Sequence, residues 1–446
     1  MIDLRIAIAV ATLALLSGCA VFGGSGSLLP GAGLVVGDEP EAVKAGAAAL
    51  AHGGNAADAA TAAYFTLAVT YPVAAGLGGG GLCIVRDTGR GKSEAFDFLA
   101  REPVHGGPFA IPGNVAGFSH LQALYGRLPW QRLISPAESL AAAGFPISQA
   151  LAARLAASQN AIRLDAALSA EFLDETGHVK PPGTFVTAPT LAQSLTLVRT
   201  LGPAAFYRGP IAAGLVAYAN AQGGAITAGE LASYTPQLSE PSIIRVGQQS
   251  VFLPPAGTGA GRFAGALLSR LVNTQGQPVI TDGFGASIAA ATKATLDAYG
   301  IASLPRDLGA TGFAAEDSGG MAVACAVTMN GPFGSAHTAD NTGITLANAP
   351  NAGQTGLAAA FLTPAVAISD QGISLAGAGA GGPNGTAGVA MALLELARGE
   401  NVTEPAAIRS TGIAPYDTVN VIGCQGGICT ASPDPGAHGL GAAAGF

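Results

Sequence analysis

The chain has 446 residues, of which 49% are hydrophobic and only 11% are charged. This composition excludes an intrinsically disordered protein and can supply the core of one large domain or of two to three ordinary ones. The net charge of −8 comes from 28 acidic and 20 basic residues, and no run of Lys or Arg occurs. Nucleic-acid binding needs clustered cations, so no nucleic-acid partner is expected.

The N-terminus predicts a secretory signal. Residues 6–16 form an apolar run of about half the length that spans a bilayer. The run leads into Leu16-Ser17-Gly18-Cys19, which resembles a bacterial lipobox, in which the Cys is lipidated and becomes the new N-terminus. The alternative is an ordinary secretory signal in which the Cys stands by chance.

The lipobox interpretation divides the chain. It predicts a signal peptide over 1–18, a lipid anchor at Cys19 and a flexible tether over 19–30, since Gly and Ser follow the anchor. Ala20, rather than Asp, resembles the pattern of lipoproteins sent to the outer membrane. We therefore expect a cell-envelope protein on the periplasmic side, in contact with the membrane through its lipid anchor only.

The remaining elements follow in chain order. Ala-rich sequence after Glu39-Pro40 predicts a helix over 40–66, and two adjacent strands are expected over 82–86 and 93–98. Helical periodicity dominates 115–235. Beyond 310, short strands are expected before a final helix, over 322–329, 344–346, 365–369 and 373–376, with the helix over 387–398. Helices flanking antiparallel strands predict an α+β fold or a layered αββα arrangement and not a doubly wound sheet.

Four cysteines remain after Cys19. Cys424 and Cys429 bracket a turn-like segment and can close a small disulfide loop in an oxidising compartment, although the sequence leaves open whether they do. Cys83 and Cys325 lie in apolar runs and are expected to be buried as small hydrophobic residues. The six histidines are scattered, so neither a metal site nor a cofactor is expected. A dinucleotide fingerprint at Gly76-x-Gly78-x-x-Gly81 is discounted, because a strand-like run rather than a helix follows it.

A series of ordered motifs resembles the γ-glutamyltransferase (glutathione hydrolase) family. The motifs are Gly53-Gly54-Asn55-Ala56-Ala57-Asp58-Ala59-Ala60, Gly76-Leu77-Gly78-Gly79-Gly80-Gly81, Pro112-Gly113-Asn114-Val115-Ala116-Gly117, Phe206-Tyr207-Arg208-Gly209 and the closing segment from Asp434-Pro435 to Phe446. The resemblance implies the N-terminal-nucleophile hydrolase fold, a four-layer αββα sandwich. It assigns 31–446 to a single domain, in which 31–309 corresponds to the family's large subunit and 310–446 to its small subunit.

The same resemblance implies a degenerate active site. The family's nucleophile is a Thr that first cuts the peptide bond before itself, and counting back without a gap from Thr328-Met329-Asn330 places it at Ala310. The family's neighbouring His falls on Gly312. Ala has no hydroxyl, so the chain is expected to stay uncleaved and catalytically silent. Thr311 is the fallback nucleophile, but a shift of one residue turns a side chain to the other face of a strand.

The substrate-binding positions implied by the resemblance are also changed. Leu99 stands where the family has an Arg for the glutamyl α-carboxylate, and Arg101 is the nearby substitute. Other family side chains correspond to Ala352, Ala360-Phe361 and Asn384. The retained positions are Thr328, a catalytic position, Asn330 in substrate binding, and Gly381-Gly382, whose N–H groups form the family's oxyanion hole.

Two hypotheses follow. The first is a silent family member that serves as an envelope lipoprotein and binds a small γ-glutamyl or amino-acid-like ligand, or a protein partner that the sequence does not identify. The second is an active γ-glutamyl transferase or hydrolase with an altered substrate, which uses Thr311.

Overall fold

The computed structural model describes residues 33–280, 283–351, 353–402 and 416–445. The expected signal peptide and tether, including Cys19, lie outside these residues, and so does Ala352.

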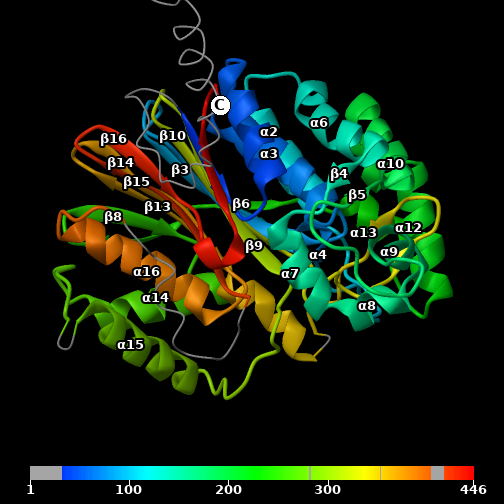
Figure 1. Ribbon diagram of the computed structural model, residues 1–446. Coiled ribbons are helices and arrows are strands. Elements are labelled where there is room, and N and C mark those ends of the chain that lie inside the picture. The colour runs from blue at the N-terminus through cyan, green and yellow to red at the C-terminus, as the bar shows by residue number, and fades with distance from the viewer. Residues whose placement is uncertain (1–32, 281–282, 352, 403–415, 446) are drawn as a thin grey trace, which may run out of the picture.

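Two antiparallel sheets pack face to face at the centre of the molecule (Figure 1). The seven-stranded sheet has the order β17-β1-β9-β10-β2-β3-β6, and the six-stranded sheet has the order β16-β15-β14-β13-β8-β7. The first comprises β1 (Leu34–Gly37), β2 (Gly80–Asp87), β3 (Lys92–Phe98), β6 (Gln237–Ser239), β9 (Ala310–Glu316), β10 (Met321–Thr328) and β17 (Leu440–Ala443). The second comprises β7 (Ser242–Val246), β8 (Gln249–Leu253), β13 (Thr363–Ser369), β14 (Gly372–Ala380), β15 (Thr418–Gln425) and β16 (Ile428–Ser432).

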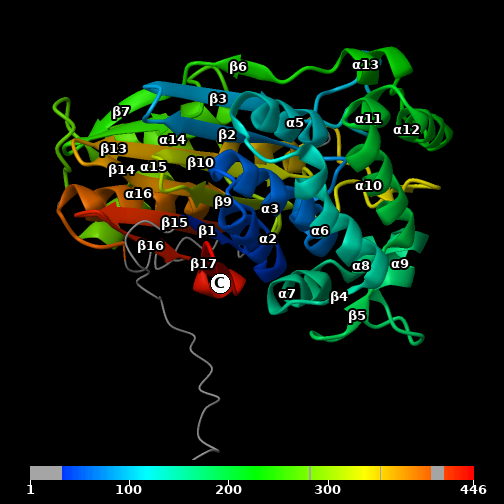
Figure 2. The same cartoon turned by 90° about the horizontal axis from the view of Figure 1, so that it is seen from above.

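Helices cover the outer faces of both sheets (Figures 1 and 2). The helices on the seven-stranded sheet are α2 (Pro40–Ala51), α3 (Ala56–Thr70) and α5 (Asn114–Tyr125), and those over the six-stranded sheet are α14 (Gly259–Leu271), α15 (Phe284–Ala298) and α16 (Pro383–Ala397). The four layers confirm the expected αββα sandwich of the N-terminal-nucleophile hydrolase type.

Further helices and short strands extend the layer around α3. They are α4 (Pro72–Ala75), α6 (Trp130–Ala143), β4 (Phe145–Pro146), α7 (Gln149–Ala157), α8 (Gln159–Leu164), α9 (Ala166–Phe172), β5 (Phe185–Val186), α10 (Pro189–Leu201), α11 (Ala204–Tyr207), α12 (Pro210–Ala221), α13 (Ala228–Ser233), β11 (Thr338–Ala339) and β12 (Ile344–Thr345). Two 3₁₀ segments, η1 (Gly353–Phe361) and η3 (Pro435–Ala437), complete the described elements. None of the described helices is long and apolar enough to cross a membrane.

The predicted helix over 40–66 is wrong in one respect, because it is two helices. α2 ends at Ala51, and a capping box starts α3 anew: the Asn55 side chain accepts from the backbone N–H of Asp58, and the Asp58 carboxylate accepts from that of Asn55. Helix propensity is high on both sides of the break, so composition alone does not reveal it.

The expectation for Cys83 and Cys325 is also corrected. Both are buried, as expected, but they form a disulfide, because β2 and β10 place them directly opposite each other. The two residues are 242 positions apart in sequence, so the pairing becomes visible only in the sheet register. Cys424 and Cys429 are disulfide-bonded as well, across the β15–β16 hairpin.

Candidate functional site

The candidate site lies where β9 begins. Ala310 is the first residue of β9, is fully buried, and stands opposite Thr328 on β10. The preceding Gly309 has a φ of +61°, and a Cβ there would lie 1.9 Å from the carbonyl oxygen of Gly331. Glycine is therefore needed for the turn into β9.

The Ala310 side chain lies in an apolar cluster between the two sheets. The cluster consists of Leu82, Ala260, Ala310, Ala326, Leu362, Ala378 and Ala380, with the partly buried Leu99 packed against them. Leu99, the residue at the expected α-carboxylate position, thus contributes to an apolar environment around the expected nucleophile position. All side chains of this cluster are apolar, so none of them can bind or activate a polar substrate group.

Gly312 faces the same way as Ala310, since side chains alternate along a strand. A Cβ at Gly312 would lie 2.8 Å from the carbonyl oxygen of Ala378 and 2.9 Å from its Cβ. The close approach of β9 and β14 therefore leaves no room for the family's His.

Thr311 points away from this cluster. Its hydroxyl is fully buried and donates a hydrogen bond of 2.6 Å to Asp38 Oδ2. Asn420 Nδ2 donates to Asp38 Oδ1 at 2.7 Å and also approaches the carbonyl oxygen of Gly312 at 2.9 Å. Burial raises the pKa of Asp38 to about 6, although the hydrogen bonds from Thr311 and Asn420 oppose the rise. Thr311 thus belongs to a buried polar network next to β1.

A buried arginine on α7 contacts the start of β9. Arg154 on α7 is 2% exposed, and its Nη1 donates to the carbonyl oxygen of Ala310 at 3.0 Å. The same guanidinium forms a bidentate ion pair with Asp307, whose Oδ1 also accepts from the backbone N–H of Gly309. A buried arginine is stabilised only when it is paired in this way. Arg154, Asp307, Asp38 and Asn420 were not predicted from the sequence. The only signal for the first three is that charged residues are rare in this chain, and Asn420 has none.

Thr328 and Asn330 are retained and lie beside the same turn. Thr328 Oγ1 is 3.0 Å from the carbonyl oxygen of Gly309 and accepts from the backbone N–H of Asn330 at 2.9 Å. Asn330 Nδ2 donates to the carbonyl oxygen of Asn348, and Asn330 Oδ1 is buried without a hydrogen-bond partner among the described residues.

Gly381 and Gly382 form the turn between β14 and α16, next to the apolar cluster that ends at Ala380. Gly381 has a φ of +87°, and a Cβ there would lie 2.5 Å from the carbonyl oxygen of Tyr416. The chain geometry therefore accounts for this glycine with or without an oxyanion to bind.

Arg101 is engaged elsewhere. Its Nη2 donates to the carbonyl oxygen of Thr235 at 2.8 Å, and its guanidinium lies 4.5 Å from the ring centroid of Tyr234. Leu99 is nearby in the chain, and its carbonyl oxygen accepts from the Tyr234 hydroxyl. Asn384, at another changed family position, is buried, and its backbone N–H donates to Asp417.

A cavity of about 360 Å³ lies among α3, α9 and the N-terminus of α10; Glu171 lines it and Ala310 does not. Burial raises the pKa of Glu171 to about 8, against the opposing charge of Lys180.

Within the described part of the chain, one group of three residues has the geometry of a metal site: Glu316, Cys424 and Cys429. The two sulfur atoms are bonded to each other, so neither is a thiolate ligand, and we assign no metal there.

Comparison with known proteins identifies relatives over part of the chain. A sequence model described as Gamma-glutamyltranspeptidase matches residues 42–278, just over half of the chain, and ends before β9. Glutathione hydrolase 2 of Arabidopsis thaliana is 33% identical over 244 residues, which cover 51% of this chain and 42% of the relative. The Glutathione hydrolase proenzyme of Escherichia coli (strain K12) is 31% identical over 299 residues, covering 62% and 51%. The chain thus spans about half the length of the curated relatives it matches.

Solved structures extend the likeness to almost the whole chain. Cephalosporin acylase from Bacillus halodurans superposes with a TM-score of 0.73 over 94% of this chain and 96% of its own, at 18% identity, which shows a common fold alone. Gamma-glutamyltranspeptidase from Helicobacter pylori superposes with a TM-score of 0.52 at 25% identity, covering 62% of this chain and 84% of its own.

Proposed function

This chain belongs to the gamma-glutamyltranspeptidase family, and we propose that it is a member without transferase activity that persists as one uncleaved chain. The observation that carries the proposal is Ala310 at the start of β9, where the resemblance places the nucleophilic Thr. A methyl group has no electron pair with which to attack a carbonyl, so neither self-cleavage nor acyl transfer begins there. The Thr311 hydroxyl offers no substitute, because it is fully buried and donates to Asp38.

Intact mass spectrometry and an activity assay test this proposal together. The purified mature protein should give one species that continues through Ala310, and it should release no p-nitroaniline from γ-glutamyl-p-nitroanilide above background. An active relative that forms two fragments is the positive control. A fragment that begins at Thr311, or turnover by the intact chain, would instead support an enzyme with an altered substrate.

The changed binding positions predict weak binding of glutathione. Leu99 and Ala352 stand where the resemblance places the charged partners of the glutamyl α-carboxylate and α-amine, and each lost charged hydrogen bond removes about 1.5–3 kcal/mol. Loss of both charged partners should weaken binding by about two decades or more. Calorimetry that finds micromolar affinity would contradict this part of the proposal.

We propose that the protein is anchored in the cell envelope by a lipid on Cys19, on the periplasmic side of the outer membrane. The support is the lipobox-like Leu16-Ser17-Gly18-Cys19 after a short apolar run. Wild-type protein should sediment with membranes and Cys19→Ala protein should not. Wild-type protein that is wholly soluble in the periplasmic fraction would exclude the anchor.

A small amino-acid-like ligand would fit the cavity beside Glu171 rather than the cluster around Ala310. The cavity volume of about 360 Å³ lies in the range of small-molecule sites. Glu171 is partly buried at the cavity wall, and a ligand ammonium group beside it would favour the ionised carboxylate and lower its raised pKa. A thermal-shift screen of amino acids should give a hit that Glu171→Gln abolishes and the exposed-site variant Glu175→Gln retains. A hit that survives Glu171→Gln would place the ligand elsewhere.

A further inference from the structure

The β15–β16 hairpin carries a disulfide at the edge of the six-stranded sheet. Cys424 on β15 and Cys429 on β16 are direct cross-strand partners, and Gly426 and Gly427 close the turn between them. β16 is an edge strand of the six-stranded sheet. Cys429 is partly exposed, whereas Cys424 is 8% exposed.

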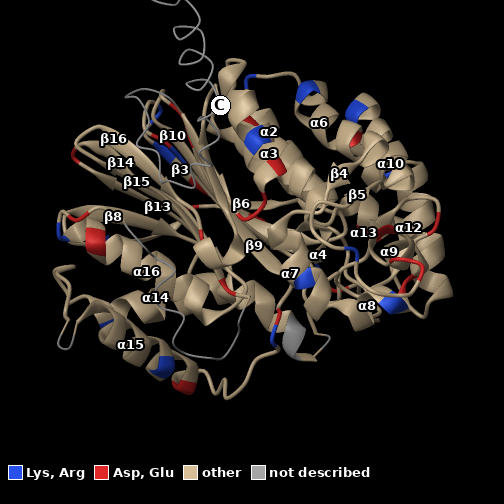
Figure 3. Cartoon of the chain, in the orientation of Figure 1, with Lys and Arg blue, Asp and Glu red and all other residues tan. Residues whose placement is uncertain are grey.

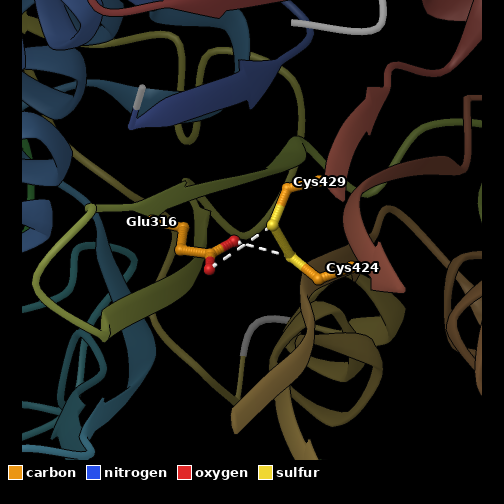
Figure 4. Close-up of a disulfide and its surroundings, with 3 residues drawn as sticks. All are labelled: Glu316, Cys424 and Cys429. Carbon is orange, nitrogen blue, oxygen red and sulfur yellow. Dashed lines mark hydrogen bonds between the residues drawn. A yellow bond between two sulfur atoms is a disulfide. The ribbon is translucent and has the colours of Figure 1, made fainter. Parts of the chain in front are cut away.

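An acidic side chain from the other sheet reaches this disulfide. Glu316 is the last residue of β9, and its Oε2 lies 3.0 Å from Cys424 Sγ while its Oε1 lies 3.7 Å from Cys429 Sγ (Figure 4). A disulfide sulfur carries no hydrogen, so neither contact is a hydrogen bond that the sulfur donates. Within the described residues, no basic side chain pairs with this carboxyl. These surroundings favour a protonated Glu316 carboxyl while the disulfide is intact. They would also suit a Glu316 that accepts hydrogen bonds from Cys424 and Cys429 as thiols.

The charge state of Glu316 agrees with this geometry. Burial and, to a smaller extent, the neighbouring Asp317 carboxylate raise the pKa of Glu316 to about 8. A carboxylic acid that keeps its proton near neutral pH and touches two sulfur atoms is placed to protonate a leaving thiolate.

We propose that Cys424 and Cys429 form a thiol–disulfide exchange site that small-molecule thiols reduce, with Glu316 as the proton donor to Cys424. The thiolate of one small thiol attacks the Sγ of Cys429, the more exposed of the two residues. A bond forms between these two sulfurs, the Cys424–Cys429 bond breaks, and its electron pair goes to Cys424 Sγ. Cys424 takes the proton of Glu316, which regains a proton from solvent.

A second small thiol completes the exchange. Its thiolate attacks the small-molecule sulfur of the mixed disulfide and releases Cys429 as a thiolate, which solvent protonates. Two electrons and two protons pass to the protein, and two small thiols leave as one oxidised disulfide. The Glu316 carboxyl, protonated again from solvent, then lies beside two thiols that can donate S–H···O hydrogen bonds to its oxygens.

The second disulfide of the chain is an internal control. Cys83 and Cys325 join β2 and β10 inside the seven-stranded sheet, with exposed fractions of 1% and 0%. No carboxylate contact to either sulfur is recorded within the described residues. A small thiol should therefore reduce the hairpin disulfide first.

The test uses the full mature chain, graded mixtures of reduced and oxidised glutathione, rapid alkylation and peptide mass mapping. Cys424 and Cys429 should become alkylated in the native protein while Cys83 and Cys325 stay bonded. Glu316→Gln, which keeps the shape and removes the acidic proton, should slow this reduction by about 100-fold, the scale of general acid catalysis. Glu400→Gln, at an exposed site, should react like wild type.

The intact Cys83–Cys325 bond reports in each sample that the protein is still folded. Equal resistance of both disulfides in the wild type, or an unchanged rate in folded Glu316→Gln protein, would overturn the proposal. Because no step uses Ala310 or the cavity beside Glu171, the result is independent of whether the chain is catalytically silent as a transferase.

Discussion

Ala310 and Thr311 are neighbours in β9 with opposite surroundings. Ala310 lies among apolar side chains between the sheets, and Thr311 donates to a buried carboxylate. The family resemblance located the first residue, and strand alternation accounts for the second. The sequence did not reveal Asp38, because a lone Asp after a short apolar strand has many ordinary explanations. Its role depends on Asn420, 382 positions away in the chain.

Restoring the hydroxyl at residue 310 should not restore cleavage. Ala310→Thr places an unpaired hydroxyl in the apolar cluster, which should lower the free energy of unfolding by about 1–3 kcal/mol. Gly312 still lacks the family's His, and the backbone of Ala378 leaves no space for one. Intact mass should show one uncut chain.

Ala310→Val is the control that separates the effect of the hydroxyl from the effect of the added volume, since Val has nearly the volume of Thr and no hydroxyl. Urea denaturation of both variants should show that Ala310→Thr is the less stable. A cut before residue 310 in Ala310→Thr would mean that the site retains its catalytic groups and has lost only the nucleophile.

At the scale of elements, strands with clear patterns were predictable and breaks were not. The expected strands over 82–86 and 93–98 appear as β2 and β3, paired antiparallel as adjacent partners. The prediction of one helix over 40–66 was wrong because a connection of four residues, 52–55, interrupts the Ala-rich sequence and ends in the capping box of α3. The disulfide between Cys83 and Cys325 depends on β2 and β10 being neighbours, and that pairing joins distant segments. Local periodicity carries no information of this kind.

The start of α3 should be sensitive to its cap. Asn55 accepts from the backbone N–H groups of Ala57 and Asp58, and its Nδ2 donates to the carbonyl oxygen of Tyr125 at 2.6 Å. Asn55→Ala should therefore lower the free energy of unfolding by about 1–2 kcal/mol. Asn220→Ala, at an exposed position on α12, is the matched control and should change it by less than about 0.5 kcal/mol. Equal effects of the two substitutions in urea denaturation would show that the cap is unimportant.

At the scale of the whole molecule, charge is scarce and several acids are buried. Figure 3 shows Lys, Arg, Asp and Glu dispersed over helices, strands and loops of the chain. Burial raises the pKa of five carboxyl groups: Asp38 to about 6, Glu39 to about 7, Glu171 and Glu316 to about 8, and Asp97 above its ordinary value. The pKa values of Glu138, Asp174 and Glu230 are lowered below their ordinary values near 4. The titration of these groups therefore affects stability only at lower pH. Between pH 5 and pH 8 the carboxyl groups with raised pKa therefore dominate the pH dependence of stability.

The free energy of unfolding should fall as the pH rises from 5 to 8. In this range the unfolded chain has already lost these protons and the folded chain still holds them, so the folded state binds more protons and loses stability with rising pH. Each fully buried acid contributes a slope of about 1.4 kcal/mol per pH unit until its folded pKa is passed. Glu39→Gln keeps an acceptor for the Ala42 N–H and the Thr70 hydroxyl but removes the titrating proton, so it should flatten the slope between pH 5 and pH 7. The control Glu240→Gln, at an exposed position, should leave the slope unchanged. Urea denaturation at half-unit pH steps measures the slope, and a stability that rises toward pH 8 would show that these acids are ionised in the folded protein.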